Sequence, residues 1–304
     1  MYKTSTLVLT LIIASVSVSA IQAKDNWDKW RIMENDHFRI YSDEKEKKVR
    51  ALLEDIEKFR LVVEKALNVE VPKINVLLFN SSRDYKKIAP TGKIAGFVKS
   101  IDGVATIVIP SIGRGLKSEA IIKHEYARIA QAYDSRKTPS WFREGMAEMF
   151  ANVNYYGEYA VIGSVQRSHT RYAYRRLNYN HIISNDFDTL ENQLGADPYA
   201  QYWLLTNYIM THDDGVYRDK LSKYLRQFQS GVESKIAFKS AFGVDANSFA
   251  RQATNLYRKP IYRNQPLIYK MDLTIMESES TLKTPMPNRV ANIMNALSKS
   301  LDDW

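Results

Sequence analysis

The chain contains the segment His124-Glu125-Tyr126-Ala127-Arg128 and, after a short gap, Pro139-Ser140-Trp141-Phe142-Arg143-Glu144-Gly145-Met146-Ala147-Glu148-Met149-Phe150. Residues four positions apart share one face of a helix, so the first segment is predicted to present His124 and Arg128 side by side. Proline suits the first turn of a helix, which makes Pro139 the predicted start of a second helix. Glu144 and Glu148 also share a face there, and the short connection predicts that the two faces meet.

The first segment matches most of a zinc-binding motif. In His-Glu-x-x-His the two histidines hold one Zn²⁺, and the glutamate between them activates a metal-bound water. His124 and Glu125 match the first two positions, but Arg128 occupies the position of the second histidine and cannot ligate a metal. A single His-Glu pair is a weak signal by itself. The second segment strengthens it, because Glu144 and Glu148 supply further acids from the next helix.

Together the two segments resemble the peptidase-MA-like domain of exported bacterial proteins, a gluzincin-type zinc metallopeptidase family. Its motif runs HExxH, a short gap, then P-x-W-[LF]-x-E-G-x-A-E-x-[FY]. The similarity extends to residues 34–43, 199–203, 213–215 and 242–245, and so covers most of the chain. The resemblance implies a zincin-like fold with His124 and Glu144 as zinc ligands. It further implies that Glu125 is the general base and that Glu148 orients a ligating imidazole.

Arg128 is where the chain departs from the family pattern. Two unit charges about 4 Å apart interact by ~4 kcal/mol at an effective dielectric constant near 20, so an inward-facing arginine disfavours a zinc ion. Carboxylates left behind by a lost metal also need a cation, and a guanidinium can grip a carboxylate through two donors. The sequence therefore predicts a metal-free site in which Arg128 pairs with Glu125, Glu144 or Glu148.

Three functions remain open at this point. The first is an exported protein of the gluzincin fold with an incomplete zinc site and weak or absent peptidase activity. The second is an active zinc-dependent peptidase that acts on a peptide or protein and takes its missing ligand from elsewhere. The third is a basic envelope protein that binds anionic glycans. The Tyr- and Arg-rich residues 155–180 are candidates either to line a cleft for an acidic peptide or glycan or to pack over the helical half. The candidate substitute ligands are His37, His169, His181 and His212, and the candidate oxyanion donors are Tyr199 and Tyr202.

The N-terminus and the composition point to export. Residues 1–23 combine Lys3, an apolar run over 7–18 and small residues before position 24, which is typical of a secretory signal peptide. We expect a periplasmic or secreted protein without a transmembrane segment, because no later apolar run reaches spanning length. The chain has no cysteine and a net charge of +9. For an exported protein, this charge favours anionic envelope surfaces or acidic substrates over nucleic acid.

The hydrophobic pattern predicts an α+β protein. Strands are expected at 37–42, 74–79, 96–99 and 104–109, and a long helix at 44–68, which together form an α/β subdomain over 24–116. A mainly helical subdomain with the His124 site is expected over 117–259. Its helices are predicted at 118–133, from Pro139 onward, and at 198–211, 217–229, 232–242 and 247–257. Residues 260–304 are expected to form a loosely packed extension with a short amphipathic helix near 290–301.

Overall fold

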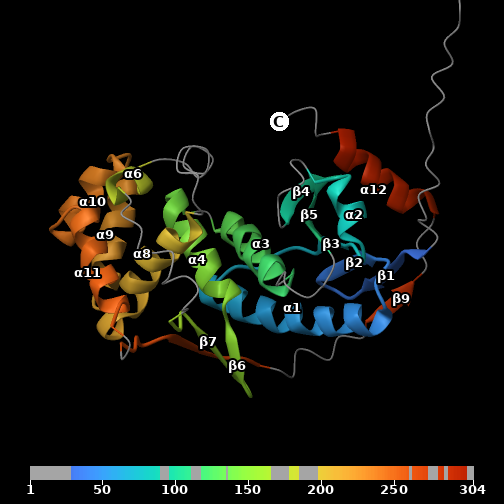
Figure 1. Cartoon of the computed structure of the whole chain (residues 1–304), viewed down its shortest axis with the longest axis horizontal. Coiled ribbons are helices and arrows are strands. Elements are labelled where there is room, and N and C mark those ends of the chain that lie inside the picture. The colour runs from blue at the N-terminus through green and yellow to red at the C-terminus, as the bar shows by residue number, and fades with distance from the viewer. Residues whose placement is uncertain are drawn as a thin grey trace, which may run out of the picture.

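The computed structural model describes residues 29–89, 96–110, 118–134, 136–165, 178–184, 198–259, 262–272, 280–283 and 287–299. Over these residues the protein is α+β, with an α/β region at one end and a group of helices at the other (Figure 1). The predicted signal peptide at 1–23 lies outside the described residues.

The α/β region is built on a mixed sheet with the strand order β4-β5-β3-β2-β1-β9. The strands are β1 (Arg31–Glu34), β2 (Phe38–Ser42), β3 (Ile74–Leu78), β4 (Phe97–Ile101), β5 (Val104–Ile109) and β9 (Thr281–Lys283). The pairs β2–β3 and β3–β5 are parallel, and the remaining pairs are antiparallel. The turn between β4 and β5 has positive φ at both Asp102 and Gly103, as a two-residue type I′ hairpin requires.

Helices cover both faces of this sheet. On one face α1 (Glu46–Leu67) packs over Ile40 and Val76, which are fully buried. On the other face α2 (Ser82–Lys86) and α12 (Pro287–Lys299) cover Leu77 and Val108. The C-terminal region is therefore more tightly packed than its sequence predicts, because β9 extends the sheet and α12 buries an apolar stripe. That stripe consists of Val290, Ile293, Met294 and Leu297.

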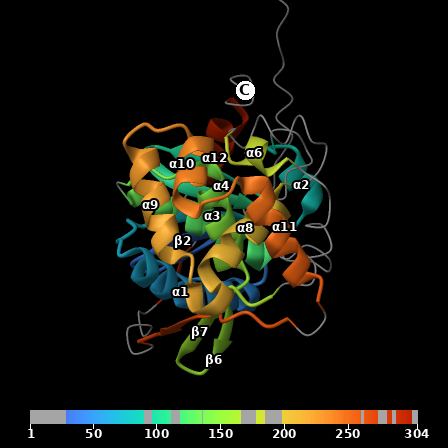
Figure 2. The same cartoon turned by 90° about the vertical axis from the view of Figure 1, so that its left-hand side faces the viewer.

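The second half is mainly helical, as predicted. Its elements are α3 (Ser118–Tyr133), α4 (Ser140–Ala151), α6 (Tyr179–Ile182), α8 (Tyr199–Thr211), the 3₁₀ turn η2 (His212–Gly215), α9 (Arg218–Gln229), α10 (Ser234–Phe242) and α11 (Ala246–Tyr257). α3 packs against both α1 and α4, and α4 packs in turn against α8 (Figure 2). Trp141 and Phe150 seat α4 in the core, where both are almost completely buried. α3 and α4 thus join the two halves.

A second, three-stranded sheet was not predicted. It has the order β6-β7-β8 and consists of β6 (Asn154–Tyr156), β7 (Tyr159–Ile162) and β8 (Leu267–Lys270). The β6–β7 hairpin directly follows α4 and projects from the body of the molecule in both views (Figures 1 and 2).

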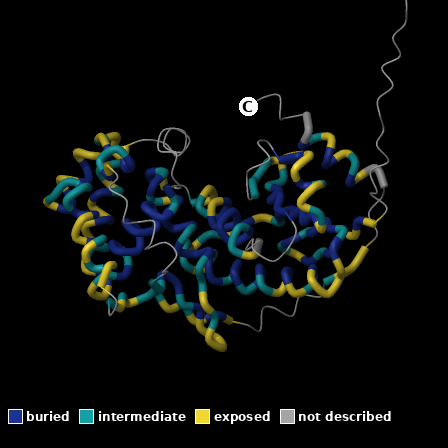
Figure 3. The backbone as a smooth tube through the Cα atoms, viewed as in Figure 1, coloured by how far each residue is buried: buried dark blue, intermediate teal, exposed yellow. Residues whose placement is uncertain are grey.

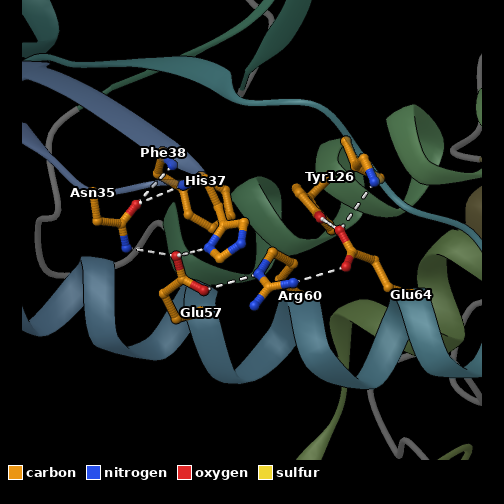
Figure 4. Close-up of polar contacts among 8 residues, drawn as sticks. Asn35, His37, Phe38, Glu57, Arg60, Glu64 and Tyr126 are labelled. Carbon is orange, nitrogen blue, oxygen red and sulfur yellow. Dashed lines mark hydrogen bonds and ion pairs between the residues drawn. The ribbon is translucent and has the colours of Figure 1, made fainter. Parts of the chain in front are cut away.

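A polar network fixes how α3 lies on α1 (Figure 4). The buried Arg60 of α1 donates to Glu57 at 2.9 Å and to Glu64 at 2.8 Å. Glu64 also accepts a hydrogen bond from the hydroxyl of Tyr126 on α3 at 2.8 Å, while Glu57 contacts His37 beside β2 at 3.1 Å. Since Tyr126 lies inside the first motif segment, this network sets the rotation of the helix that carries His124.

The end of β1 gives a prediction about acid stability. Burial alone would raise the pKa of Glu34, but hydrogen bonds from Arg39, Lys73 and Lys283 outweigh it and lower that pKa from 4.5 to about 2. A carboxylate with a depressed folded pKa stabilises the protein above its unfolded pKa, and this stabilisation is lost as the pH falls through the folded value. We expect Glu34→Gln to lower the free energy of unfolding by about 3 kcal/mol at pH 7, and by progressively less from pH 4.5 down to pH 2.

Urea unfolding of both proteins across that pH range measures the effect. Glu46→Gln is the matched control, because Glu46 is 52% exposed and pairs only with Arg50 among the ion pairs of the described residues. The control should change stability by less than ~1 kcal/mol. A Glu34→Gln deficit that stays constant from pH 7 to pH 2 would contradict the assignment.

Candidate functional site

The structure brings His124 of α3 together with two carboxylates of α4. His124 Nε2 lies 3.3 Å from Glu144 Oε2, and His124 Nδ1 lies 2.9 Å from Glu148 Oε1. The side chains of His124 and Glu144 are only 9% and 5% exposed. The predicted meeting of the two helix faces is therefore observed, and each ring nitrogen of the histidine faces a different glutamate.

Arg128 joins the same cluster from the next turn of α3. Its Nε lies 3.2 Å from Glu144 Oε1, and its Nη1 donates to Glu125 Oε2 at 3.1 Å. The guanidinium thus pairs with two of the three predicted carboxylates. Because its side chain is 44% exposed, we expect its loss to cost less than the ~3 to 5 kcal/mol typical of a fully buried pair.

Electrostatics in the cluster balance two cations against three carboxylates. Burial lowers the pKa of the His124 imidazole, but its contacts with Glu144 and Glu148 outweigh this and raise the pKa to about 10. Burial also raises the pKa of Glu125, although the positive charge of Arg128 opposes that shift. In this arrangement the imidazole and the guanidinium offset the charge of two of the three acids.

The implied zinc ion can be tested against this geometry. Two ligands of a tetrahedral zinc with bonds of roughly 2.0 to 2.1 Å lie about 3.3 Å apart. His124 Nε2 and Glu144 Oε2 have this separation and are both buried. The position of the second histidine ligand, however, carries Arg128, whose guanidinium binds the other oxygen of Glu144. The residues present therefore do not fit a three-ligand zinc site, because a fixed cation occupies the place of one ligand.

The aromatic candidates separate into one neighbour of the site and one core residue. The Tyr199 ring meets the His124 ring edge-on, with centroids 5.3 Å apart. Burial raises the pKa of the Tyr199 phenol, so it remains protonated at neutral pH. Tyr202, one turn further along α8, is fully buried. The structure thus places Tyr199 beside His124 and Tyr202 in the core.

Two of the candidate substitute histidines, His37 and His212, have contacts with other residues. His37 contacts Glu57 on α1. His212 stacks on Tyr208 with centroids 4.5 Å apart, and its Nδ1 lies 3.1 Å from the hydroxyl of Tyr262. His181 lies in α6. His169 lies outside the described residues, as does the part of the Tyr- and Arg-rich stretch from 166 to 177, which holds all of its arginines. The described residues contain no group of three or more His, Cys, Asp or Glu side chains suited to a metal ion.

Sequence reasoning missed Lys123, the residue that precedes His124. Its buried ammonium lies 2.8 Å from Asp55 of α1 and over the rings of Phe59 and Tyr155, at 5.9 and 5.3 Å from their centroids. Lys123 therefore ties α3 to α1 and to strand β6. A lysine is usually exposed, and only the position of Asp55 on the inner side of α1 could have indicated this pairing.

No model of a known protein family matches the chain, and no curated protein matches it. The resemblance to peptidase-MA-like domains thus rests on the residues quoted above. Among the described helices, none is both long and apolar enough to cross a membrane.

Proposed function

We propose that this is an exported protein of the gluzincin metallopeptidase fold with an incomplete zinc site, in which Arg128 replaces one zinc ligand and pairs with the carboxylates around it. It has weak or absent peptidase activity and acts as a polypeptide-binding module. The observation that carries this proposal is the pair of contacts from the Arg128 guanidinium to Glu144 and Glu125, at 3.2 and 3.1 Å. One arginine thereby engages both the implied third ligand and the implied general base.

Hydrolysis of a peptide bond at such a site needs a cation that polarises the carbonyl and a water that is activated for attack. A guanidinium supplies positive charge and can donate hydrogen bonds to a water. It cannot coordinate the water oxygen, so it does not lower the pKa of that water as a metal ion does. The carboxylate of Glu125 is also engaged by Arg128, so it is not positioned as a free base. The export part of the proposal rests on the signal-peptide pattern of residues 1–23.

An active zinc peptidase is the second candidate, and one observation favours it. His124 Nε2 and Glu144 Oε2 keep the separation of two zinc ligands. This alternative needs a further ligand and needs Arg128 to leave its carboxylate partners. The two candidates therefore differ in the metal content of the purified protein.

The first test is zinc stoichiometry combined with proteolysis. The protein is first dialysed against excess zinc and then against zinc-free buffer. We expect it to retain well under one equivalent of zinc per chain, as measured by elemental mass spectrometry. We expect it to bind unstructured casein without cleaving it, and any residual cleavage to be unchanged by 1,10-phenanthroline. Glu125→Gln should leave that background unchanged. One tightly held equivalent of zinc with chelator-sensitive cleavage would establish the second candidate instead.

A further inference from the structure

The three-stranded sheet has two different faces. Ala160 and Ile162 point to the core and are fully buried, as expected for the inner face. By the alternation of strand residues, Tyr156, Tyr159 and Ile268 lie on the opposite, outer face. They are 66%, 42% and 65% exposed. An antiparallel sheet normally turns polar side chains to solvent, so an outer face of this kind indicates an interaction surface.

This outer face has basic surroundings. Lys270 lies opposite Tyr159 in the register, and Lys65 of α1 donates to the carbonyl of Lys270 at 2.8 Å. The one acid of the hairpin, Glu158, is neutralised by Lys270 at 3.3 Å. The approach to β8 is also basic, since the charged residues over 258–270 are all cations, and Asp272 is the first acid beyond the strand. The cations are Arg258, Lys259, Arg263 and Lys270, and all are exposed.

The shape of this region restricts its partner. The β6–β7 hairpin projects from the body as a convex, exposed tip (Figure 3). A stable interface with a second copy of the chain would need roughly 20 to 30 residues on each side, and the three short strands supply far fewer. A planar, anionic surface needs no such area, because a few inserted aromatic and aliphatic side chains act together with nearby cations.

We propose that the outer face of β6, β7 and β8 is a peripheral attachment site for an anionic phospholipid bilayer. Tyr156, Tyr159 and Ile268 enter the headgroup region, where the amphipathic tyrosine ring is favoured. Lys65 and Lys270 remain at the level of the phosphates. This surface does not include the Arg128 cluster, so the attachment goes beyond the proposed function and does not depend on it.

Vesicle flotation of the whole purified chain tests the attachment. The chain should float with vesicles of phosphatidylglycerol and phosphatidylethanolamine, and much less with phosphatidylcholine alone. The triple variant Tyr156→Ser/Tyr159→Ser/Ile268→Ser should weaken the apparent affinity at least about tenfold. Lys65→Gln/Lys270→Gln should weaken it about fivefold for each lysine removed, and added salt should abolish that difference.

The matched control is Tyr133→Ser/Val216→Ser/Ile236→Ser, which removes side chains that are 47%, 54% and 59% exposed elsewhere on the molecule. It should bind like the unmodified chain, and circular dichroism should show all variants folded. Three outcomes would overturn the proposal. They are equal flotation of the two triple variants, no flotation of the unmodified chain with anionic vesicles, and a dimer or a glycan complex that only the sheet variant loses.

Discussion

Arg128→His is expected to turn the chain into a zinc-binding protein. The substitution places an imidazole four residues after His124, on the helix face that already meets Glu144 and Glu148. Competition with a fluorescent zinc chelator should show one tight site per chain, with an affinity at least about a hundredfold above that of the unmodified protein. Chelator-sensitive cleavage of casein would then be measurable if Glu125 is released to act as a base.

The size of this effect follows from charge and from ligand count. Removing a cation about 4 Å from the metal position relieves ~4 kcal/mol for two unit charges at an effective dielectric constant near 20, or roughly three orders of magnitude in affinity. The expected gain in zinc affinity is smaller than this value, because the Arg128 side chain is 44% exposed and solvent screens its charge. Supplying a third ligand acts in the same direction. His124 Nε2 and Glu144 Oε2 already have a ligand-like separation of 3.3 Å, so these two atoms need to move little. The His124 imidazole must lose a proton to bind the metal, which reduces the gain in affinity at neutral pH.

Two control variants separate these contributions. Arg128→Ala removes the cation but adds no ligand, so it should gain far less zinc affinity than Arg128→His. Arg136→His makes the same exchange at a 65% exposed arginine that pairs with Asp134, and it should gain none. If Arg128→His bound no more zinc than Arg136→His, the cluster would not be a metal site that lacks one ligand, and the motif would serve packing alone.

The arrangement of the candidate site was predictable because its signals are local. The spacing of His124 and Arg128, and that of Glu144 and Glu148, fixes which side chains share a helix face. Pro139 marks the start of α4, and a short connection leaves little choice in how α4 returns to α3. The exposure of Arg128 was not predictable, because it depends on how much of the guanidinium is covered by elements that are distant in the sequence.

The parts that sequence reasoning missed depend on long-range pairing. β8 and β9 follow α11 but join β7 and β1, which both lie many residues earlier in the chain. Strands this short carry little periodicity, and their positions are set by the partner strand. The tight packing of α12 has the same origin, since its apolar stripe is defined only by the sheet face that it covers.

The position of α4, the helix that carries Glu144, also depends on a contact with an element distant in the sequence, α8. The backbone of α4 approaches α8 closely at Gly145, which is buried. A Cβ atom at Gly145 would lie 2.1 Å from Thr206 Oγ1 and 2.5 Å from the Tyr202 carbonyl oxygen. A rotation of the threonine side chain can relieve the first contact, but the second involves backbone and requires the two helices to move apart.

Gly145→Ala is therefore expected to destabilise the fold, although alanine favours a helix interior over glycine by about 1 kcal/mol. We expect the clash to outweigh this gain and to leave a net loss of about 2 to 3 kcal/mol, which corresponds to a fall of about 5 to 10 °C in the melting temperature. Thermal unfolding followed by circular dichroism measures it. Thr206→Ala should restore part of the loss in the double variant, because it removes the contact with Thr206 Oγ1, while the contacts with the Tyr202 carbonyl oxygen and with the Thr206 Cβ at 2.8 Å remain. An unchanged or higher melting temperature for Gly145→Ala would show that α4 and α8 are not held at this distance, and the placement of Glu144 beside His124 would lose its support.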